Sequence, residues 1–289
     1  MKPAGFVYHR PASLEEALAQ LAAGAPHARL LAGGQSLAPM LNMRLASPEA
    51  LIDLNDLSEL AYIRQTDGAL EIGALTRHDA LANSPLVQTR CPLLGQAART
   101  IGHYAIRQRG TLGGSLAHAD PAAQLPLAAV TLGATLSLLS SRGRREMAAD
   151  EFFLSAMSTA LHADEIILSV RFPVQAAGEA SAFELFSRRR GDFAIVAVAA
   201  SVCLRQRRFV ERVRLGVSGV DAVPRRLDSA LPIGEAQLAD AAWAEEAARS
   251  VAAIVTPEED ARIPARYRQE LVQTLVQRAL AKAVDAARE

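Results

Sequence analysis

Two pairs of adjacent glycines, each followed by a small hydroxyl side chain, are the residues whose types and spacing best fit ligand chemistry. The first pair stands in Ala32-Gly33-Gly34-Gln35-Ser36 and the second in Thr111-Leu112-Gly113-Gly114-Ser115. Glycine has no Cβ and tolerates positive φ, so a Gly-Gly step lets backbone N–H groups approach an oxyanion closely. The hydroxyl adds one more donor. A single Gly-Gly pair usually marks a turn. Two matched Gly-Gly pairs in one chain, however, predict a binding site for a diphosphate.

The surroundings of the second pair carry further polar groups in an otherwise apolar chain. Arg107 and Arg109 precede it and can counter phosphate charge, and Asp120 follows it and can accept hydrogen bonds from hydroxyls or ring N–H groups. This composition favours a ligand loop. A solvated loop in which Asp120 forms a turn before Pro121 stays open as the alternative.

Other kinds of site find no support in the sequence. No G-x-G-x-x-G or G-x-x-x-x-G-K-[ST] motif occurs, which argues against a Rossmann or P-loop nucleotide site. The two cysteines form no C-x-x-C spacing, and the six histidines show no H-E-x-x-H spacing. The carboxylate pairs Asp53/Asp56 and Asp164/Glu165 fit strand ends better than acid–base catalysis. We expect neither a catalytic side chain nor a metal site in this chain.

Composition narrows the partners and the compartment. Among 289 residues, 31 Lys and Arg balance 31 Asp and Glu, so no net charge attracts nucleic acid or an anionic membrane. Cys91 and Cys203 are interpreted as buried thiols, which fits a reducing compartment. The N-terminal residues lack the apolar stretch of a secretory signal. The longest apolar stretch, 125–139, is a buried element too short to span a bilayer. We expect a cytoplasmic protein without transmembrane segments.

The pattern of apolar residues predicts an α+β chain that opens with a helix. Ser13 and Glu16 form a capping box in front of a helix over 14–23. Short apolar runs at 29–32 and 50–54 predict strands, so the opening order is helix, strand, glycine turn, strand.

Later segments divide at a small, polar stretch with Pro173 and Gly178, which is typical of a linker. Before it we expect strands at 69–72, 134–139 and 166–172 and a helix at 93–101; after it we expect strands at 183–187, 194–204 and 212–220 and helices at 238–254 and 267–287. The predicted domains are 1–176, with subdomains of about 1–57 and 58–176, and 177–289, an antiparallel sheet covered by helices.

Three motifs in this order carry a family resemblance. They are residues 32–37 with Pro39 and Arg44, the stretch from Ile106 to Pro121, and Arg188-Arg189-Arg190-Gly191-Asp192-Phe193-Ala194. With these motifs the chain resembles the FAD-binding medium subunit of molybdenum hydroxylases, the group of carbon monoxide dehydrogenase and xanthine dehydrogenase. The resemblance covers nearly the whole chain. It implies an FAD-binding fold of two α+β subdomains followed by a C-terminal domain of antiparallel sheet and helices.

The resemblance also implies which residues hold FAD. Residues 30–37 would line the diphosphate and adenine side, a second diphosphate loop would follow, Asp120 would lie near the polar chain of the flavin, and three apolar side chains would contact the rings. The implied cofactor-binding residues are Arg29, Leu30, Leu31, Ala32, Gly33, Gly34, Gln35, Ser36, Leu37, Ile101, Thr111, Gly113, Gly114, Ser115, Asp120, Ile166 and Phe193.

The implied function is electron transfer through noncovalent FAD. In such assemblies a large molybdopterin subunit oxidises the substrate, a small subunit relays electrons through [2Fe–2S] clusters, and the flavin passes them to an acceptor. A dimer of such heterotrimers is expected. A self-contained FAD oxidase or reductase, and a scaffold without flavin, stay open as alternatives. The substrate and the acceptor, whether NAD, a quinone, a cytochrome or oxygen, are left open.

Overall fold

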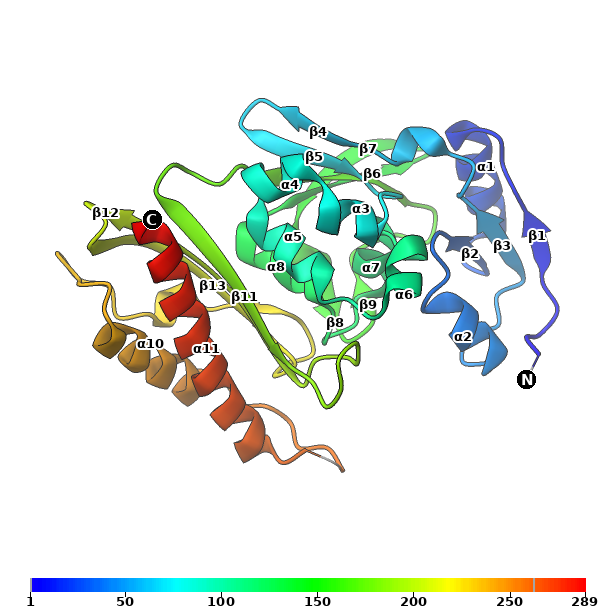
Figure 1. Cartoon of the computed structure of the whole chain (residues 1–289). Coiled ribbons are helices and arrows are strands. Elements are labelled where there is room, and N and C mark those ends of the chain that lie inside the picture. The colour runs from blue at the N-terminus through cyan, green and yellow to red at the C-terminus, as the bar shows by residue number, and fades with distance from the viewer. Residues whose placement is uncertain (1, 262) are drawn as a thin grey trace.

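Three larger sheets with their helices, and one two-stranded hairpin, make up the described part of the chain in this computed structural model, which describes residues 2–261 and 263–289. Figure 1 shows them side by side, with the N-terminal sheet at one end of the molecule and the C-terminal sheet at the other. The five-stranded sheet and a group of short helices lie between them.

The N-terminal sheet is parallel and small. Its strands, in spatial order, are β1 (Val7–His9), β3 (Ala50–Asp53) and β2 (Ala28–Leu31). The predicted first helix is confirmed as α1 (Leu14–Gly24), where the Ser13 hydroxyl accepts a hydrogen bond from the Glu16 N–H at 3.2 Å. The Glu16 carboxylate closes the capping box by accepting from the Ala12 N–H at 2.8 Å.

One helix was missed in this region. Between the first glycine pair and β3 the chain forms α2 (Leu37–Asn42), where the sequence predicted only a turn. Six residues are too few to show a helical period, and no side chain caps the start of α2. The helix matters for the site because it fixes the exit of the glycine loop.

The middle region is an antiparallel sheet covered by helices. Its strands, in spatial order, are β4 (Ile63–Thr66), β5 (Ala69–Gly73), β10 (Ile166–Pro173), β6 (Thr135–Ser140) and β7 (Gly143–Ala148). The helices are α3 (His78–Asn83), α4 (Pro85–Arg90), α5 (Pro92–Arg99), α6 (Tyr104–Arg109), α7 (Leu112–His118), α8 (Gln124–Leu132) and α9 (Ala149–Phe152). A hairpin of β8 (Phe153–Ser155) and β9 (Ser158–Thr159) and the 3₁₀ turn η1 (Ser58–Leu60) complete the region.

The strands predicted at 69–72, 134–139 and 166–172 and the helix predicted at 93–101 are confirmed by β5, β6, β10 and α5, with shifts at their ends. The apolar stretch 125–139 is buried but holds two elements, α8 and β6, which meet at Gly133 in a left-handed conformation. An uninterrupted apolar run hides such a change from helix to strand.

The C-terminal region is a four-stranded antiparallel sheet. It consists of β11 (Glu179–Phe186), β12 (Val196–Arg205), β13 (Phe209–Ser218) and β14 (Arg225–Arg226), with η2 (Asp228–Ala230), α10 (Ala241–Ile254) and α11 (Ala265–Arg288). The strands and both helices predicted here are confirmed, although their ends shift by a few residues. Figure 1 shows α10 and α11 on the outer face of this sheet.

β12 joins the two larger cores because both of its faces are buried. Ala197 and Ala199 belong to the core that contains α5 and α8, while Val196 and Val198 belong to the core formed with α10 and α11. Successive strand residues face opposite sides of a sheet, so one strand serves both cores. The C-terminal sheet is thereby fixed against the middle region.

Candidate functional site

One large cavity, with a volume of about 1080 Å³, lies where the three regions meet. Its wall takes residues 26–30 and 32–37 from the N-terminal region, the α6–α7 segment and the β8–β9 hairpin from the middle region, and Gly191, Asp192 and Phe193 from the connection between β11 and β12. Deep concave sites of this kind typically bind cofactors.

The predicted site residues gather at this cavity. Sixteen of them line it: Arg29, Leu30, Ala32, Gly33, Gly34, Gln35, Ser36, Leu37, Ile101, Thr111, Gly113, Gly114, Ser115, Asp120, Ile166 and Phe193. Leu31 lies next to this set but does not line the cavity, and its side chain instead packs near Gly34.

The first glycine pair presents a run of unused hydrogen-bond donors. In the described part of the chain, the backbone N–H groups of residues 33–36 have no acceptor, and the Ser36 hydroxyl also has no partner. Gly34 has φ +70°, a conformation that glycine adopts without strain. The Gly34 carbonyl already accepts the first bond of α2, from the Ala38 N–H at 3.0 Å. Consecutive free N–H groups form a concave site for an anion.

The second glycine pair differs from its prediction. It lies in the first turn of α7, and the four N–H groups there are all bonded: Leu112 to the Thr76 carbonyl, Gly113 to the Ala74 carbonyl, and Gly114 and Ser115 to Thr111. The expectation of free backbone donors at this pair is therefore wrong. The glycines allow close packing instead, because a Cβ on Gly113 would lie 2.6 Å from the Ala74 Cβ.

A polar network holds the two glycine segments together. The Gly33 backbone is so close to α6 that a Cβ there would lie 2.3 Å from the Arg109 carbonyl oxygen. Arg77 donates to that same carbonyl at 2.5 Å and to the Asn55 side chain at 2.7 Å, and Asn55 donates to the Ala32 carbonyl at 2.9 Å. Burial, with a smaller contribution from the charge of Arg109, lowers the pKa of Arg77. Sequence reasoning missed Arg77 and Asn55 because neither belongs to a motif.

His78 is a second residue that sequence reasoning missed. It is buried in the cavity wall, where its Nε2 lies 2.9 Å from the Thr111 carbonyl oxygen. A carbonyl only accepts, so Nε2 carries the proton and donates. Its Nδ1 has no partner in the described structure, and the space beside that edge exists because Gly110 has no Cβ. Burial lowers the pKa of His78 to about 4, so the ring is neutral.

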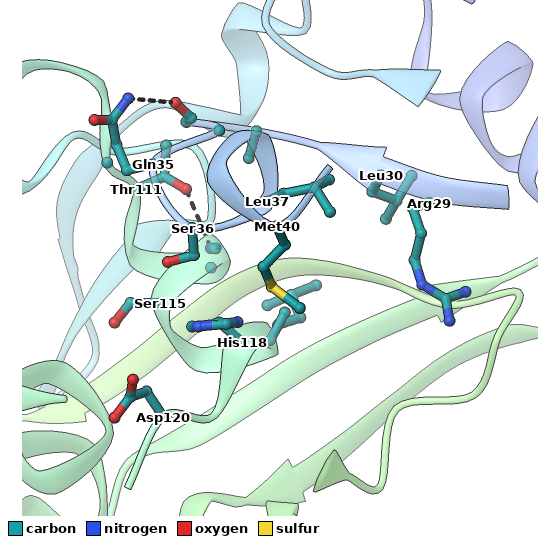
Figure 2. A pocket seen from close by; sticks show the side chains of 18 of the residues that line it. Arg29, Leu30, Gln35, Ser36, Leu37, Met40, Thr111, Ser115, His118 and Asp120 are labelled. Carbon is teal, nitrogen blue, oxygen red and sulfur yellow. Dashed lines mark hydrogen bonds between the residues drawn. The ribbon is translucent and has the colours of Figure 1, made fainter. Parts of the chain in front are cut away.

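Three oxygen-bearing side chains follow one another along the wall. Figure 2 shows the side chains of Ser36, Ser115 and Asp120 one after another in space, with Met40 and His118 beside them. The Asp120 carboxylate accepts from the Ala122 N–H at 2.8 Å, which fixes its orientation in the turn before Pro121. Asp120 therefore has both of the features considered from the sequence: it forms the turn before Pro121, and it lines the cavity.

The segment between β11 and β12 brings one large aromatic side chain to the cavity. Phe193 is 65% exposed there although it lines the cavity, whereas Ile166 in the wall is 1% exposed. Gly191, at φ +91°, packs against the His103 ring, where a Cβ would lie 2.6 Å from Cε1. The β11–β12 connection and α6 thus approach each other across the mouth.

The carboxylate pairs considered for acid–base work are bound to partners. Asp53 accepts from Tyr8 at 2.5 Å and from Asn55, and Glu165 forms an ion pair with Arg145 at 2.7 Å. The Arg145 guanidinium lowers the pKa of Glu165, so this carboxylate stays ionised and bound. Within residues 2–261 and 263–289 no group of three or more His, Cys, Asp or Glu side chains could hold a metal ion. Cys91 and Cys203 are buried free thiols, as predicted.

Comparison with known proteins supports the family resemblance seen in the sequence motifs. Residues 4–175 match the family described as the FAD binding domain in molybdopterin dehydrogenase, and residues 181–283 match the CO dehydrogenase flavoprotein C-terminal domain. The 6-hydroxypseudooxynicotine dehydrogenase complex subunit alpha of Paenarthrobacter nicotinovorans is 39% identical over 292 residues, with 100% of this chain and 97% of that protein covered. The carbon monoxide dehydrogenase medium chain of Hydrogenophaga pseudoflava is 38% identical, with 97% of each chain covered.

Solved structures agree in fold over the full length. A chain of quinoline 2-oxidoreductase from Pseudomonas putida 86 superimposes with a TM-score of 0.94 at 36% identity, and 100% of each chain is covered. A chain of carbon monoxide dehydrogenase from Hydrogenophaga pseudoflava gives a TM-score of 0.93 at 37% identity, with 99% of each covered. These matches confirm the predicted α+β fold class and the family resemblance. The chain belongs to the family of FAD-binding medium subunits of molybdopterin dehydrogenases, the carbon monoxide dehydrogenase and xanthine dehydrogenase group.

Proposed function

We propose that FAD binds noncovalently in the 1080 Å³ cavity with its diphosphate on the loop of residues 33–36. The observation that carries this proposal is the run of four unpaired N–H groups, extended by the free Ser36 hydroxyl. Buried or half-buried donors without partners are costly, so they indicate an absent acceptor. A diphosphate supplies several oxygens at the spacing of successive N–H groups.

The remaining wall fits the other parts of FAD. The Ser115 hydroxyl and the free Asp120 carboxylate oxygen are suited to the hydroxyls of the ribityl chain, and Ile101, Ile166 and Phe193 offer apolar surface to the rings. FAD supplies the redox chemistry when bound, and the chain supplies position and electrostatics. Leu30, residues 32–37 and the segment from Thr111 to Ser115 hold the cofactor in this proposal, and Arg29 is also part of the cavity wall.

The chain is an oxidoreductase component of the medium-subunit class. We infer that it passes electrons from [2Fe–2S] clusters on a small subunit, through FAD, to an external acceptor, while a large molybdopterin subunit oxidises the substrate. Relatives named as a medium chain or as a subunit of a complex support this assignment over a self-contained flavoenzyme or a scaffold. A dimer of heterotrimers in the cytoplasm is part of the proposal. Within the described residues, no helix is both long and apolar enough to cross a membrane.

We also propose a boundary between two domains after residue 176. Two features support this division: β10 and β11 belong to different sheets, and the two family matches end at 175 and begin at 181. The first unit then holds most of the FAD site, and the second contributes Phe193.

The diphosphate assignment is tested by comparing FAD with riboflavin, which lacks both the diphosphate and the adenosine, and by a variant of the diphosphate loop. We expect the full chain to bind FAD about a hundredfold more tightly than riboflavin, since charge-assisted hydrogen bonds contribute about 1.5 to 3 kcal/mol each. Gly34→Val removes the left-handed turn and should bring both affinities close together. Gly68→Val is the matched control, because Gly68 has nearly the same φ of +67° but lies in the β4–β5 turn, outside the cavity. Equal loss in both variants, or no preference for FAD in the wild type, contradicts the assignment.

A further inference from the structure

Three consecutive arginines, Arg188, Arg189 and Arg190, form an exposed basic surface, which we call the arginine rim. In the described part of the chain, their guanidinium groups make no hydrogen bond or ion pair. Many other arginines of the molecule are paired with carboxylates, such as Arg142 with Asp164 at 2.5 Å. The rim therefore keeps its positive charge uncompensated.

The rim lies at the mouth of the cofactor cavity. The three residues that follow it directly, Gly191, Asp192 and Phe193, line that cavity, and Gly191 packs on the His103 ring of the opposite wall. The backbone of the rim is held in a turn, because the Arg189 carbonyl accepts from the Ser187 hydroxyl at 2.8 Å and from the Asp192 N–H at 3.1 Å. The backbone of the rim is thus held directly beside residues that line the cavity.

Large aromatic side chains stand beside this charge. Phe193 is 65% exposed, and Tyr104, next to His103 on α6, is 66% exposed. Arginine and aromatic residues are the types enriched at protein–protein interfaces. The arginines themselves do not line the cavity, so they are placed to meet a partner at its mouth rather than a small molecule inside it.

We infer that the arginine rim, with Tyr104 and Phe193, is the docking surface for the acidic face of a soluble one-electron carrier protein that accepts electrons from this subunit. This inference rests on the proposed function. Permanent subunit interfaces are mostly apolar, whereas weak electron-transfer encounters are small and steered by charge. Exposed arginines without an ion pair therefore fit a transient acceptor better than a permanent subunit.

The electron balance of this step is simple. Two carrier molecules each accept one electron, the two-electron-reduced flavin returns to its oxidised form, and two protons are released. No other oxidant or reductant takes part.

The test uses two forms of one haem protein that differ in surface charge. Native cytochrome c is basic, and succinylation of its lysines makes it acidic. The flavin-loaded full chain, or the complex in which it purifies, is reduced with dithionite without oxygen, separated from the remaining dithionite, and then mixed with either form at low ionic strength. Binding of each oxidised cytochrome to the immobilised protein is measured separately.

Two triple variants are compared. In the first, Arg188, Arg189 and Arg190 are all changed to Gln. In the control, Arg205, Arg207 and Arg208 are changed to Gln; these exposed arginines lie at the β12–β13 turn. The ten residues of β12 separate this turn from the rim by about 30 Å.

We expect the wild type to bind and reduce succinylated cytochrome c faster than the native form. The rim variant should lower both the affinity and the rate for the succinylated form about tenfold, with no loss for the native form. The control variant should stay within about twofold of the wild type. Added salt should remove the difference between wild type and rim variant.

Three results would overturn the inference. The first is that the wild type shows no preference for the acidic form, and the second is that the two triple variants behave alike. The third is that the rim variant purifies without subunits that accompany the wild type, which would make the rim a subunit interface. Flavin content separates this failure from that of the proposed function: a chain without FAD contradicts the proposed function, whereas a flavin-loaded chain with no charge preference contradicts only the docking surface.

Discussion

Gly33 shows how a missing side chain positions a site. Its importance lies in contact rather than in its φ, because the Arg109 carbonyl occupies the space that a Cβ would need. The close approach brings residues 33–36 next to the α6–α7 segment, and Arg77 fixes the distance by bonding to the same carbonyl. Two segments separated in sequence by some 70 residues thereby form one wall.

Gly33→Ala should separate these segments. The added Cβ would lie 2.3 Å from a backbone oxygen that cannot rotate away, so we expect FAD affinity to fall about tenfold or more, together with a loss of about 2 kcal/mol in the free energy of unfolding. Flavin fluorescence titration and urea unfolding measure the two effects. Gly5→Ala is the control, because no atom lies within 4 Å of a Cβ at Gly5. An unchanged affinity in a folded Gly33→Ala protein would show that the close approach is dispensable.

His78 gives the site a defined dependence on pH. Its pKa is about 4 in the folded chain and about 6.5 when unfolded, so between these values the unfolded state binds the extra proton. The free energy of unfolding therefore falls as pH drops from 6.5 towards 4. Between pH 7 and pH 5, the shifted pKa of His78 lowers the free energy of unfolding by about 2 kcal/mol.

Replacing His78 by Gln should remove that contribution. We expect the difference in unfolding free energy between pH 7 and pH 5 to be about 2 kcal/mol smaller in the variant than in the wild type, because other titrating groups affect both proteins alike. Denaturant unfolding at the two pH values measures this. If both proteins lose the same stability, His78 is not buried in the neutral form.

At the residue scale, the sequence predicted the members of the wall better than the bonds that hold it. Gly33, Gly34 and Ser36 could be found because a glycine pair before a hydroxyl is a local pattern. Arg77 and His78 could not, because their roles depend on carbonyl groups of residues 109 and 111 that only the fold brings near.

At the scale of elements, similar sequences took different conformations. The first glycine pair forms an open loop before α2, whereas the second lies inside the first turn of α7. Thr111 decides this difference, because its hydroxyl caps the Gly114 N–H at 3.1 Å.

The longest helix, α11, contributes to the site without lining it. Arg268 donates to the Ile195 and Gly219 carbonyls at 2.9 and 2.7 Å, just after the Phe193 segment. The Gly219 N–H in turn donates to the Pro121 carbonyl at 3.2 Å, next to Asp120. One arginine therefore ties α11 to both connections that border the cavity.

Arg268→Ala should loosen this junction. Removing the guanidinium leaves two carbonyls without their donor, so we expect the free energy of unfolding to fall by about 3 kcal/mol and FAD to bind more weakly. The control is Arg266→Ala on the same helix, whose side chain is 89% exposed and pairs with Glu270; its effect should stay within about 0.5 kcal/mol. Thermal and urea unfolding of both variants measure the difference. Similar losses in the two proteins would place the effect in the helix itself.

At the scale of the whole molecule, the contact between α8 and β13 decides how the C-terminal sheet sits on the middle region. A Cβ at Gly216 would lie 1.9 Å from the Thr131 hydroxyl oxygen, so the strand approaches the helix as closely as glycine allows. The order of predicted helices and strands indicated the α+β class, but the contact depends on which faces meet, and one sequence does not contain that information in a local pattern.

Gly216→Ala should force α8 away from β13 and lower the free energy of unfolding by about 3 kcal/mol. Thr131→Ala in the same chain removes the nearest atom and should restore part of this loss. Gly234→Ala serves as the control, because a Cβ there meets no atom within 4 Å. Calorimetry of the four proteins checks the series. Stability unchanged by Gly216→Ala would mean that the two regions are not packed against each other in solution.

The cavity wall, which takes residues from all three regions, has one more consequence. A cofactor in contact with every region binds only when the regions are assembled, so its binding and their assembly are linked by mass action. At a free FAD concentration of a hundred times Kd, this linkage adds about 2.7 kcal/mol to the folded state. FAD then stabilises the contacts between the regions, and substitutions far from the cavity that weaken these contacts will lower FAD affinity and give colourless protein although every residue of the cavity wall is unchanged.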